Sequence, residues 1–479
     1  MSLFQEFEKV ANTQREKIAI VSRGHRISFG SLLEMVNRFD LSMRHHISPG
    51  RKRIAFASNR LDLHVIMMLV ASRNSHMVLF SAPDVLDDCG IEYDYFLTDQ
   101  PAKAGDADNR IWIGKAWFSI PKHNFPADQK FDGGEAVFVE ATSGSTGQPM
   151  LYPVKDETWV AGLSNHVEFH EIQPFDTRVF CSTSTAVRWS HNVTFQSLLR
   201  GGSVFFAVST EEYLPHLIDL YQVNFLAITP AFAAKLFAVD KVSQYLQNVK
   251  KIALGGAFVS PSLVERVAAV TPASITVALG ATENNYLSAY THDPKKLHPD
   301  GYVGDVIDPD FDIAFFDPDT REKISTNEGL IGVRHPQSAL ATPYLNTKGN
   351  LREDAFKEGY FLSGDIMRLD GNALFHLGRS SNIVNIGGNK YSIDQIEQVL
   401  SETPGLDNVT AFSHSEDDGF EQLHVAYTAD RDLLLDDLNQ LLGSKIKFVK
   451  IHQAKRFRAM PLNASTKIDR AKVKEIYFR

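Results

Sequence analysis

The sequence predicts a layered α/β fold followed by a smaller α+β unit, and three observations support this class. Short β-rich runs alternate with helical runs through most of the chain, as in layered α/β proteins. From about Gly301 the alternation gives way to strands separated by Asp-Pro and Gly turns, which indicates a β-rich segment. After Arg379 a smaller β-α-β pattern begins. We therefore expect a large N-terminal domain, residues 1–379, and a small C-terminal domain, residues 380–479.

The alternation starts with a strand, a helix and a second strand. Residues 53–57 form a short apolar run that is typical of a buried strand. Residues 61–72 are apolar over a length that fits a helix, and residues 77–80 form the next short apolar run. The pattern then recurs twice. Its members are the predicted strands 177–180, 203–207, 225–228 and 251–254 and the predicted helices 194–200 and 232–239.

The composition is that of an ordinary globular protein with more than one domain. Of the 479 residues, 43% are hydrophobic and 22% are charged, which argues against a disordered, fibrous or disulfide-stapled chain. At roughly 150 residues per domain, this length corresponds to about two to four structural units. The formal net charge of −9 provides no case for nucleic-acid binding, although a local cluster of basic groups can still hold a small anion.

Cysteine usage and the character of the N-terminus indicate a cytoplasmic protein. The two cysteines, Cys89 and Cys181, have neither redox nor metal spacing, which fits a reducing compartment and excludes a cysteine-based zinc site. The N-terminus lacks the basic and apolar regions of a signal peptide. The longest purely apolar run, residues 65–71, is far shorter than the roughly 20 residues of a membrane span. We therefore expect a cytoplasmic, enzyme-sized protein with no membrane span.

A loop of small hydroxylated residues and glycines follows the strand predicted at residues 136–141. Such a loop directs several backbone N–H groups and hydroxyls at one point, which suits a polyphosphate. It differs from a Walker P-loop, because no Gly-Lys-Ser/Thr ends it. A plain surface turn has a similar composition and is the alternative. The loop consists of Thr142, Ser143, Gly144, Ser145, Thr146, Gly147, Gln148 and Pro149.

Residues 142–149 resemble the phosphate loop of the adenylate-forming superfamily, which includes acyl- and aryl-CoA ligases, adenylation domains of nonribosomal peptide synthetases and beetle luciferase. Four further motifs of that family follow in the same order, so the resemblance covers nearly the whole chain. It implies an N-terminal domain of two layered αβ subdomains plus a β-barrel-like subdomain, and a mobile C-terminal lid. It also implies an AMP-forming acid–thiol ligase that uses ATP, Mg²⁺ and either coenzyme A or a phosphopantetheine group.

Two of these motifs imply contacts to adenine and to a metal ion. Residues 249–257 resemble a strand and Gly-Gly turn whose exposed backbone forms a floor for adenine and the acyl group. Residues 279–283 resemble the Gly-x-Thr-Glu motif, in which Thr282 and Glu283 are catalytic and the Glu283 carboxylate can hold Mg²⁺ between the phosphates. The residues implied in the Gly-Gly turn are Gly255, Gly256 and Ala257.

The other two motifs lie on either side of the predicted domain boundary. Residues 360–365, together with Arg379, resemble a ribose clamp, in which Asp365 accepts hydrogen bonds from both ribose hydroxyls and Arg379 adds a charged contact. Residues 461–470 resemble the C-terminal motif that delivers a catalytic lysine, Lys467. Because attack of a carboxylate on the α-phosphate of ATP joins two anions, a cation on the closing lid would neutralise the developing charge. An ordinary exposed lysine before a short helix is the alternative.

The resemblance also implies a hinge and a thiol channel at the start of the lid. The hinge is Ser381, where the family usually has Asp or Lys, and a serine can still absorb the rotation between the adenylation and thioester-forming poses. The thiol channel includes Gly388 and Lys390. Six basic and no acidic residues lie between Lys445 and Arg458. We interpret this run as a docking surface for coenzyme A phosphates or an acidic carrier protein, with a solvated strand face as the alternative.

Three positions depart from the family pattern. Met150 follows the proline of the phosphate loop, where the family normally has lysine. Thr466 stands where glycine is usual before the lysine, and Leu279 replaces a common aromatic residue against adenine. Together these departures are consistent with a degenerate or specialised member of the adenylate-forming family.

The acyl pocket that the resemblance implies favours an aryl acid. Amino-acid-activating relatives place an aspartate in this segment, and none lies between Ser182 and Gln196, which argues against an α-amino acid. The pair His191-Asn192 resembles the His-Asn of aryl-acid-activating enzymes, whereas a second register places Arg188 in the pocket instead. We favour an aromatic or hydroxylated aryl carboxylate over a long-chain fatty acid. The implied pocket residues are Arg188, His191, Asn192, Gly280 and Ala281.

Three functions are consistent with the sequence. The first is a ligase that forms an acyl-AMP and passes the acyl group to coenzyme A. The second is an adenylation enzyme that loads an acyl carrier protein, which we expect to be a separate chain. The third is a non-catalytic nucleotide- or acyl-binding member, which Met150 and Thr466 favour and the retained catalytic and ribose-binding residues oppose. The expected partners are a small carboxylic acid and either coenzyme A or a separate acyl carrier protein, with no nucleic acid and no membrane span.

Overall fold

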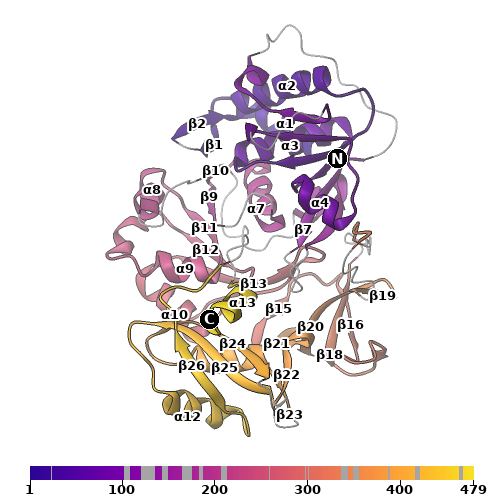
Figure 1. Cartoon of the computed structure of the whole chain (residues 1–479). Helices are drawn as coiled ribbons and strands as arrows, with labels where there is room; N and C mark the ends of the chain where they lie inside the picture. Colours follow the sequence, from indigo (N-terminus) through magenta and orange to yellow (C-terminus); the bar gives the residue numbers. More distant parts are fainter. Residues whose placement is uncertain are drawn as a thin grey trace.

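Figure 1 shows the computed structural model, in which the N-terminal helices (indigo) and the C-terminal segment (gold) lie at opposite ends of the molecule. None of the helices in the described ranges combines the length and the apolar character that crossing a lipid bilayer requires. The structure describes residues 1–22, 24–101, 108–119, 135–142, 149–163, 175–182, 187–206, 213–257, 259–296, 298–299, 301–335, 344–348, 355–386, 389–415, 421–462 and 468–479.

The N-terminal part contains a six-stranded sheet with the strand order β6-β5-β3-β4-β7-β8. Neighbouring strands are parallel except β7 and β8, which are antiparallel. Helix α3 is buried on nearly all sides, because apolar residues occupy almost its whole circumference, and α1 and α2 pack against it. The elements are α1 (Leu3–Thr13), α2 (Phe29–His46), β3 (Arg53–Ala57), α3 (Leu61–Asn74), β4 (Met77–Leu79), α4 (Pro83–Cys89), β5 (Tyr95–Thr98), β6 (Arg110–Trp112), η1 (Lys115–Phe118), β7 (Val137–Thr142), β8 (Met150–Lys155) and α6 (Asp156–Gly162).

A second sheet of 15 strands begins with a parallel half. From β1 through β10, β9, β11 and β12 to β13, each strand runs parallel to the next, and β2 pairs antiparallel at the edge. Its elements are β1 (Ile18–Ser22), β2 (His25–Ser28), β9 (Arg178–Cys181), α7 (Arg188–Leu199), β10 (Ser203–Phe206), α8 (Leu214–Leu220), β11 (Phe225–Ile228), α9 (Pro230–Leu236), η6 (Val242–Tyr245), β12 (Lys251–Leu254), α10 (Pro261–Val270) and β13 (Ser274–Ala281).

The same sheet continues from β13 into an antiparallel half, in the order β14-β15-β21-β20-β18-β16-β17, with β19 paired to β20. This half is the β-rich segment predicted from Gly301 onward, and the predicted layered α/β class is confirmed. Its strands are β14 (Asn285–Thr291), β15 (Tyr302–Val306), β16 (Asp312–Phe316), β17 (Lys323–Ile324), β18 (Glu328–Arg334), β19 (Phe356–Lys357), β20 (Tyr360–Asp370) and β21 (Ala373–Arg379).

The C-terminal segment has its own sheets and its own apolar core. Strands β24 and β25 are antiparallel, and β26 returns parallel to β25 after helix α12, which is the predicted β-α-β pattern. The residue at which the two domains divide stays a prediction. The elements are η8 (Ser380–Asn382), β22 (Ile383–Ile386), β23 (Asn389–Ser392), α11 (Ile393–Leu400), β24 (Leu406–Ser415), β25 (Glu421–Ala429), α12 (Leu435–Lys445), β26 (Ile451–Arg456) and α13 (Arg470–Tyr477).

Two predicted helices begin earlier in the structure than the sequence indicated. Helix α9 begins at Pro230, because the side chain of Thr229 accepts a hydrogen bond from the backbone N–H of Phe232 and proline suits the first helical position. Helix α7 begins at Arg188 and not near residue 194. Its first turn is polar in sequence, yet Arg188 and His191 are buried because they pair with a carboxylate on β7.

Candidate active site

The expected phosphate loop connects two paired strands. Thr142 is the last residue of β7 and lies opposite Met150, the first residue of β8, so the strand pair brings the two ends of the loop together. Of the other loop residues named above, Ser143 to Gln148 lie outside the described residues. Met150 is fully buried in the main apolar core. The side chain at the position where the family carries a lysine therefore contributes to packing in this protein.

The Gly-Gly turn presents mainly backbone at the end of β12. Gly256 has a φ of +79°, in the left-handed region that favours glycine. A Cβ on Gly255 would lie 3.1 Å from the carbonyl oxygen of Ala278 and 3.8 Å from the ring of Trp189. The turn thus lies between β13 and the first turn of α7, and Ala257 beside it is exposed.

Glu283 lies in the tight turn between β13 and β14, and two tyrosines hold it there. The hydroxyl of Tyr344 donates a hydrogen bond of 2.5 Å to Oε1 of Glu283, and the hydroxyl of Tyr152 donates one of 3.3 Å to its backbone oxygen. Burial and the nearby Glu283 charge raise the pKa of Tyr152, so this hydroxyl keeps its proton. The side chain of Glu283 is buried, and Thr282 beside it is half-buried.

The residues around Glu283 fit the magnesium role that the resemblance implies. Carboxylate oxygen is the donor that Mg²⁺ prefers, and the turn presents this carboxylate beside the Gly280 and Ala281 end of β13. Within the turn, the backbone N–H of Ala281 donates a hydrogen bond of 3.0 Å to Oδ1 of Asn284. A Cβ on Gly280 would lie 2.1 Å from the backbone oxygen of Asn285, so only glycine fits at that position.

The expected ribose clamp forms between paired residues of β20 and β21. Asp365 lies opposite Arg379 in the register, and Nε of Arg379 donates a hydrogen bond of 2.8 Å to Oδ1 of Asp365. Nε2 of His376 lies 3.4 Å from the same oxygen. Burial alone raises the pKa of Asp365, but the Arg379 charge and the hydrogen bonds from His376 and Ser363 outweigh it and hold the pKa well below its usual range. Asp365 is therefore an ionised acceptor in a largely buried position.

The expected acyl-pocket residues of α7 contact a carboxylate that the sequence analysis missed. Nδ1 of His191 lies 2.7 Å from Oε1 of Glu140, and Nη1 of Arg188 lies 3.5 Å from Oε2 of the same residue. Asn192 accepts a hydrogen bond of 2.5 Å from Nε1 of Trp159 and donates one of 2.8 Å to Oδ1 of Asn285. The first turn of α7 is thereby joined both to β7 and to the turn that carries Glu283.

The segment expected to carry the catalytic lysine is held at both ends. Lys467 and Thr466 lie outside the described residues. Leu462 and Ile468 form an isolated antiparallel bridge across the segment. Immediately after it, Nη2 of Arg470 lies 3.1 Å from Asp394 and 2.5 Å from Glu397, both on α11. The bridge joins the two ends of the lysine segment, and Arg470 fixes its C-terminal end to α11, the first helix after the predicted hinge.

The junction between the two parts is closely packed. Ser381 lies in the short helix η8, Lys390 in β23, and Gly388 outside the described residues. Gly378 has a φ of +136°, and a Cβ there would lie 2.1 Å from Oγ of Ser392, the N-cap of α11. Across the interface, Nη1 of Arg266 on α10 lies 3.6 Å from Asp407 of the C-terminal part.

The basic run before the C-terminus is partly neutralised within the protein. Nζ of Lys445 lies 2.8 Å from Glu402, and Nε of Arg456 lies 3.0 Å from Asp432. Nζ of Lys455 donates to the backbone oxygen of Tyr477 at 3.1 Å. The solvated strand face, the alternative interpretation of this run, agrees with these contacts, and the docking surface stays a prediction.

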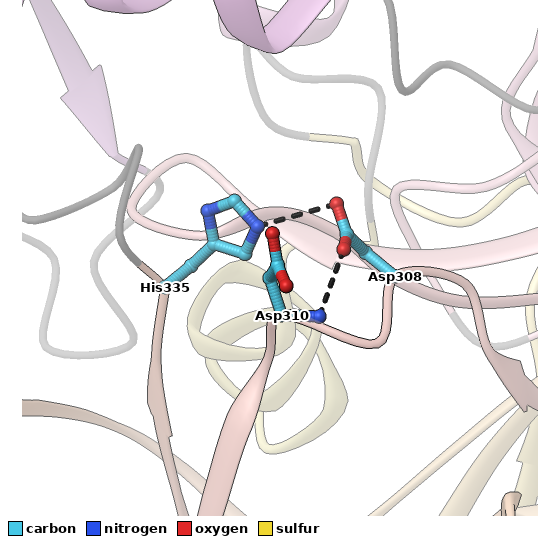
Figure 2. Close-up of side chains that lie close together, drawn as sticks. All are labelled: Asp308, Asp310 and His335. Carbon is cyan, nitrogen blue, oxygen red and sulfur yellow. Dashed lines mark hydrogen bonds and ion pairs between the residues drawn. The ribbon is translucent and has the colours of Figure 1, made fainter.

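A separate group of possible metal ligands lies in the antiparallel half of the large sheet. Figure 2 shows Asp308, Asp310 and His335, whose ligand atoms lie within 4.8 Å of one another. Both oxygens of Asp308 already have protein partners, since Nε2 of His335 lies 3.2 Å from Oδ2 and the backbone N–H of Asp310 donates to Oδ1 at 2.9 Å. We therefore assign no ion to this group.

Comparison with known proteins confirms the resemblance to the adenylate-forming family. The family model described as "AMP-binding enzyme" matches residues 91–345. Enterobactin synthase component E of Escherichia coli (strain K12) is 24% identical over 357 residues, which are 71% of this chain and 65% of that protein, less than two thirds of its length. The 2,3-dihydroxybenzoate-AMP ligase of Bacillus subtilis (strain 168) is 22% identical over 382 residues, which are 75% of this chain and 69% of that protein.

A solved structure shares the fold. The anthranilate CoA ligase AuaEII in complex with anthranoyl-AMP superimposes with a TM-score of 0.84 at 14% identity, covering 99% of this chain and 97% of that chain. At this identity the likeness shows the architecture alone. It agrees with the large N-terminal and smaller C-terminal parts seen here.

Proposed function

Because the chain belongs to the AMP-binding enzyme family, we propose that it activates a carboxylic acid with ATP, forming an acyl-AMP and releasing pyrophosphate, and then transfers the acyl group to a thiol. The observation that carries this proposal is the ion pair between the buried carboxylate of Asp365 and the half-exposed guanidinium of Arg379. An ionised carboxylate held by a guanidinium accepts hydrogen bonds from a cis-diol such as the two ribose hydroxyls. If the ion pair of Asp365 and Arg379 had only a structural role, it would not need to lie directly before the proposed hinge.

The proposed first step places the reacting groups in line. An oxygen of the substrate carboxylate attacks the α-phosphorus of ATP, and the bond from that phosphorus to the bridging oxygen of pyrophosphate breaks. Residues 142–147 contact the phosphates, and Lys467 neutralises charge on the α-phosphate and the acyl carboxylate. When bound at Glu283, Mg²⁺ supplies positive charge to the phosphates. Tyr152 and Tyr344 hold Glu283 in position for that contact.

The proposed substrate is an aryl acid. The names of two similar proteins mention 2,3-dihydroxybenzoate and anthranilate, which are both benzoic acids with a polar substituent. In this chain the aromatic ring of Trp189 lies against the Gly255–Gly256 turn, and Asn192 is fixed beside the Glu283 turn. An aromatic substrate ring that binds between the Gly255–Gly256 turn and the Glu283 turn agrees with both observations.

The proposed second step uses the C-terminal part as a lid. After pyrophosphate leaves, this part turns about Ser381, and a thiol enters beside Gly388 and Lys390 to attack the acyl carbon, with AMP as the leaving group. We propose coenzyme A as the acceptor. A phosphopantetheinylated carrier protein is the second candidate, because the relative named enterobactin synthase component E is by its name one component of a synthase.

The acceptor is identified by incubating the protein with ATP, Mg²⁺ and a panel of benzoates, and following the products by mass spectrometry. We expect an acyl-AMP without added thiol, and conversion to an acyl-CoA with release of AMP when coenzyme A is added. Conversion only with a phosphopantetheinylated carrier protein would replace coenzyme A by a carrier. Binding of ATP with no acyl-AMP from any aryl or aliphatic acid would support the non-catalytic alternative instead.

A further inference from the structure

A buried group of charges joins strand β7 to the first turn of α7, which carries expected acyl-pocket residues. Glu140 is fully buried on β7, two residues before Thr142, where the rest of the strand is apolar. Its two oxygens face His191 and Arg188 on the first turn of α7, at 2.7 Å and 3.5 Å. Both partners are buried as well. Ionised groups rarely lie in such a position unless they are paired, so the three side chains form one electrostatic unit.

Within this unit, Arg188 and Glu140 carry opposite charges. The guanidinium of Arg188 is a permanent cation and Glu140 supplies one negative charge, so the pair is neutral. The hydrogen bond between Nδ1 of His191 and Glu140 leaves Nε2 of the ring as the other polar atom. On the neighbouring helix α3, burial and then the proximity of His191 lower the pKa of His64 to about 3, so this ring adds no charge at neutral pH.

Several polar atoms of the same helical turn have no hydrogen-bond partner within the part of the chain that the structure describes. They are Nε of Arg188, Oγ of Ser190 and Nε2 of His191, all on buried side chains. Buried polar atoms without partners cost free energy, and Nε of Arg188 and Nε2 of His191, which lie three positions apart on one face of the helix, indicate a polar group that binds there. The turn also lies beside the nucleotide segments, since Trp189 packs on the Gly-Gly turn.

We propose that Glu140 sets the charge of the acyl site: by neutralising Arg188 and orienting His191, it makes the site select a carboxylic acid whose second polar group is an uncharged hydrogen-bonding substituent such as a hydroxyl. This inference rests on the proposed function, because it places the acyl group at the first turn of α7. Glu140 is a positioning residue that acts through Arg188 and His191. A second carboxylate on the substrate would face a guanidinium whose charge is already paired with Glu140.

The test is the equilibrium binding of ring-substituted benzoates, measured by titration calorimetry with α,β-methylene-ATP present so that no adenylate forms. The probes are benzoate, the three hydroxybenzoates and the three benzenedicarboxylates. For the unmodified protein we expect at least one hydroxybenzoate to bind about tenfold more tightly than benzoate, and no dicarboxylate to bind more tightly than benzoate. Preference for a dicarboxylate, or no discrimination among the probes, would overturn the inference.

Two variants should move this selectivity in opposite directions. Glu140→Gln leaves Arg188 unbalanced, so the affinity ratio of dicarboxylate to hydroxybenzoate should rise by about tenfold or more. Arg188→Met leaves Glu140 unbalanced, so the same ratio should fall. Glu157→Gln, at an exposed glutamate on α6, is the matched control and should leave the ratio unchanged. Because each ratio is measured on one protein preparation, a general loss of folded protein does not alter it.

If Glu140→Gln does not fold, the double variant E140Q/R188M still tests the role of Glu140. It removes both charges of the pair, so neither Glu140 nor Arg188 is left as an unpaired buried charge. Compared with Arg188→Met alone, it should bind dicarboxylates about tenfold more tightly relative to hydroxybenzoates. Ratios that do not change in any of these variants contradict the role of Glu140 even if acyl-AMP forms. Selective binding that shifts as described, without acyl-AMP formation, would instead contradict the proposed function and leave the charge assignment standing.

Discussion

Replacing Lys467 with alanine is expected to slow acyl-AMP formation by at least about a hundredfold. The substitution removes a cation that would act where the attacking carboxylate and the α-phosphate meet, so its effect falls on the chemical step. In the part of the chain that the structure describes, the C-terminal end of this segment is anchored by Arg470, which binds Asp394 and Glu397 on α11. We therefore expect the melting temperature to stay close to that of the unmodified protein.

The matched control is Lys472→Ala, which removes an exposed lysine five positions further along, on α13. Rapid-quench measurement of the acyl-AMP formed in a single turnover separates the chemical step from thiol transfer. A rate within about twofold of the control for Lys467→Ala would contradict the catalytic assignment and return this residue to an ordinary exposed lysine.

Asp365→Asn is expected to weaken ATP binding by about tenfold to a hundredfold, because charge-assisted hydrogen bonds contribute roughly 1.5–3 kcal/mol each. The amide keeps one acceptor oxygen and loses the negative charge that faces Arg379. The KM for ATP should therefore rise much more than kcat falls. Binding of AMP alone, measured by calorimetry, should weaken by a similar factor.

Asp370→Asn is the control for this variant, since it removes an exposed carboxylate at the end of the same strand, β20. Equal KM values for ATP in both variants would show that Asp365 has a structural role only.

The pKa of Asp365 lies below the ordinary value of 3.8, so the stability that its ionisation contributes is present above about pH 4 and lost as the pH falls further.

The parallel strands could be predicted closely from the sequence, and polar residues that form buried pairs could not. Predicted strands at residues 53–57, 225–228 and 251–254 coincide with β3, β11 and β12, because each is a short apolar run that the sheet buries. The start of α7 was missed since its first turn reads as polar. Glu140 on β7 pairs with Arg188 and His191, which explains why this polar turn is buried. The sequence of a mainly apolar strand does not indicate which distant residues its single carboxylate will contact.

The residues that support the candidate site were also beyond prediction. Tyr152 and Tyr344 contact Glu283 across 131 and 61 positions of the chain, and no spacing rule connects them. The contact of His376 with Asp365 depends on the register between β20 and β21. Met150, which we noted as a departure from the family pattern, has a physical reason that only the structure shows, namely its burial in the main core.

Exchange of radiolabelled pyrophosphate into ATP measures reversible acyl-AMP formation itself, without any assumption about the thiol. With Mg²⁺, ATP and a panel of hydroxylated benzoates, unsubstituted benzoate and aliphatic acids, we expect exchange that depends on the acid and is fastest with a hydroxylated benzoate. The exchange should disappear in Lys467→Ala and persist in Lys472→Ala. Absence of acid-dependent exchange across the whole panel, in protein that still binds ATP, would contradict the assignment of this chain as an acid-activating enzyme.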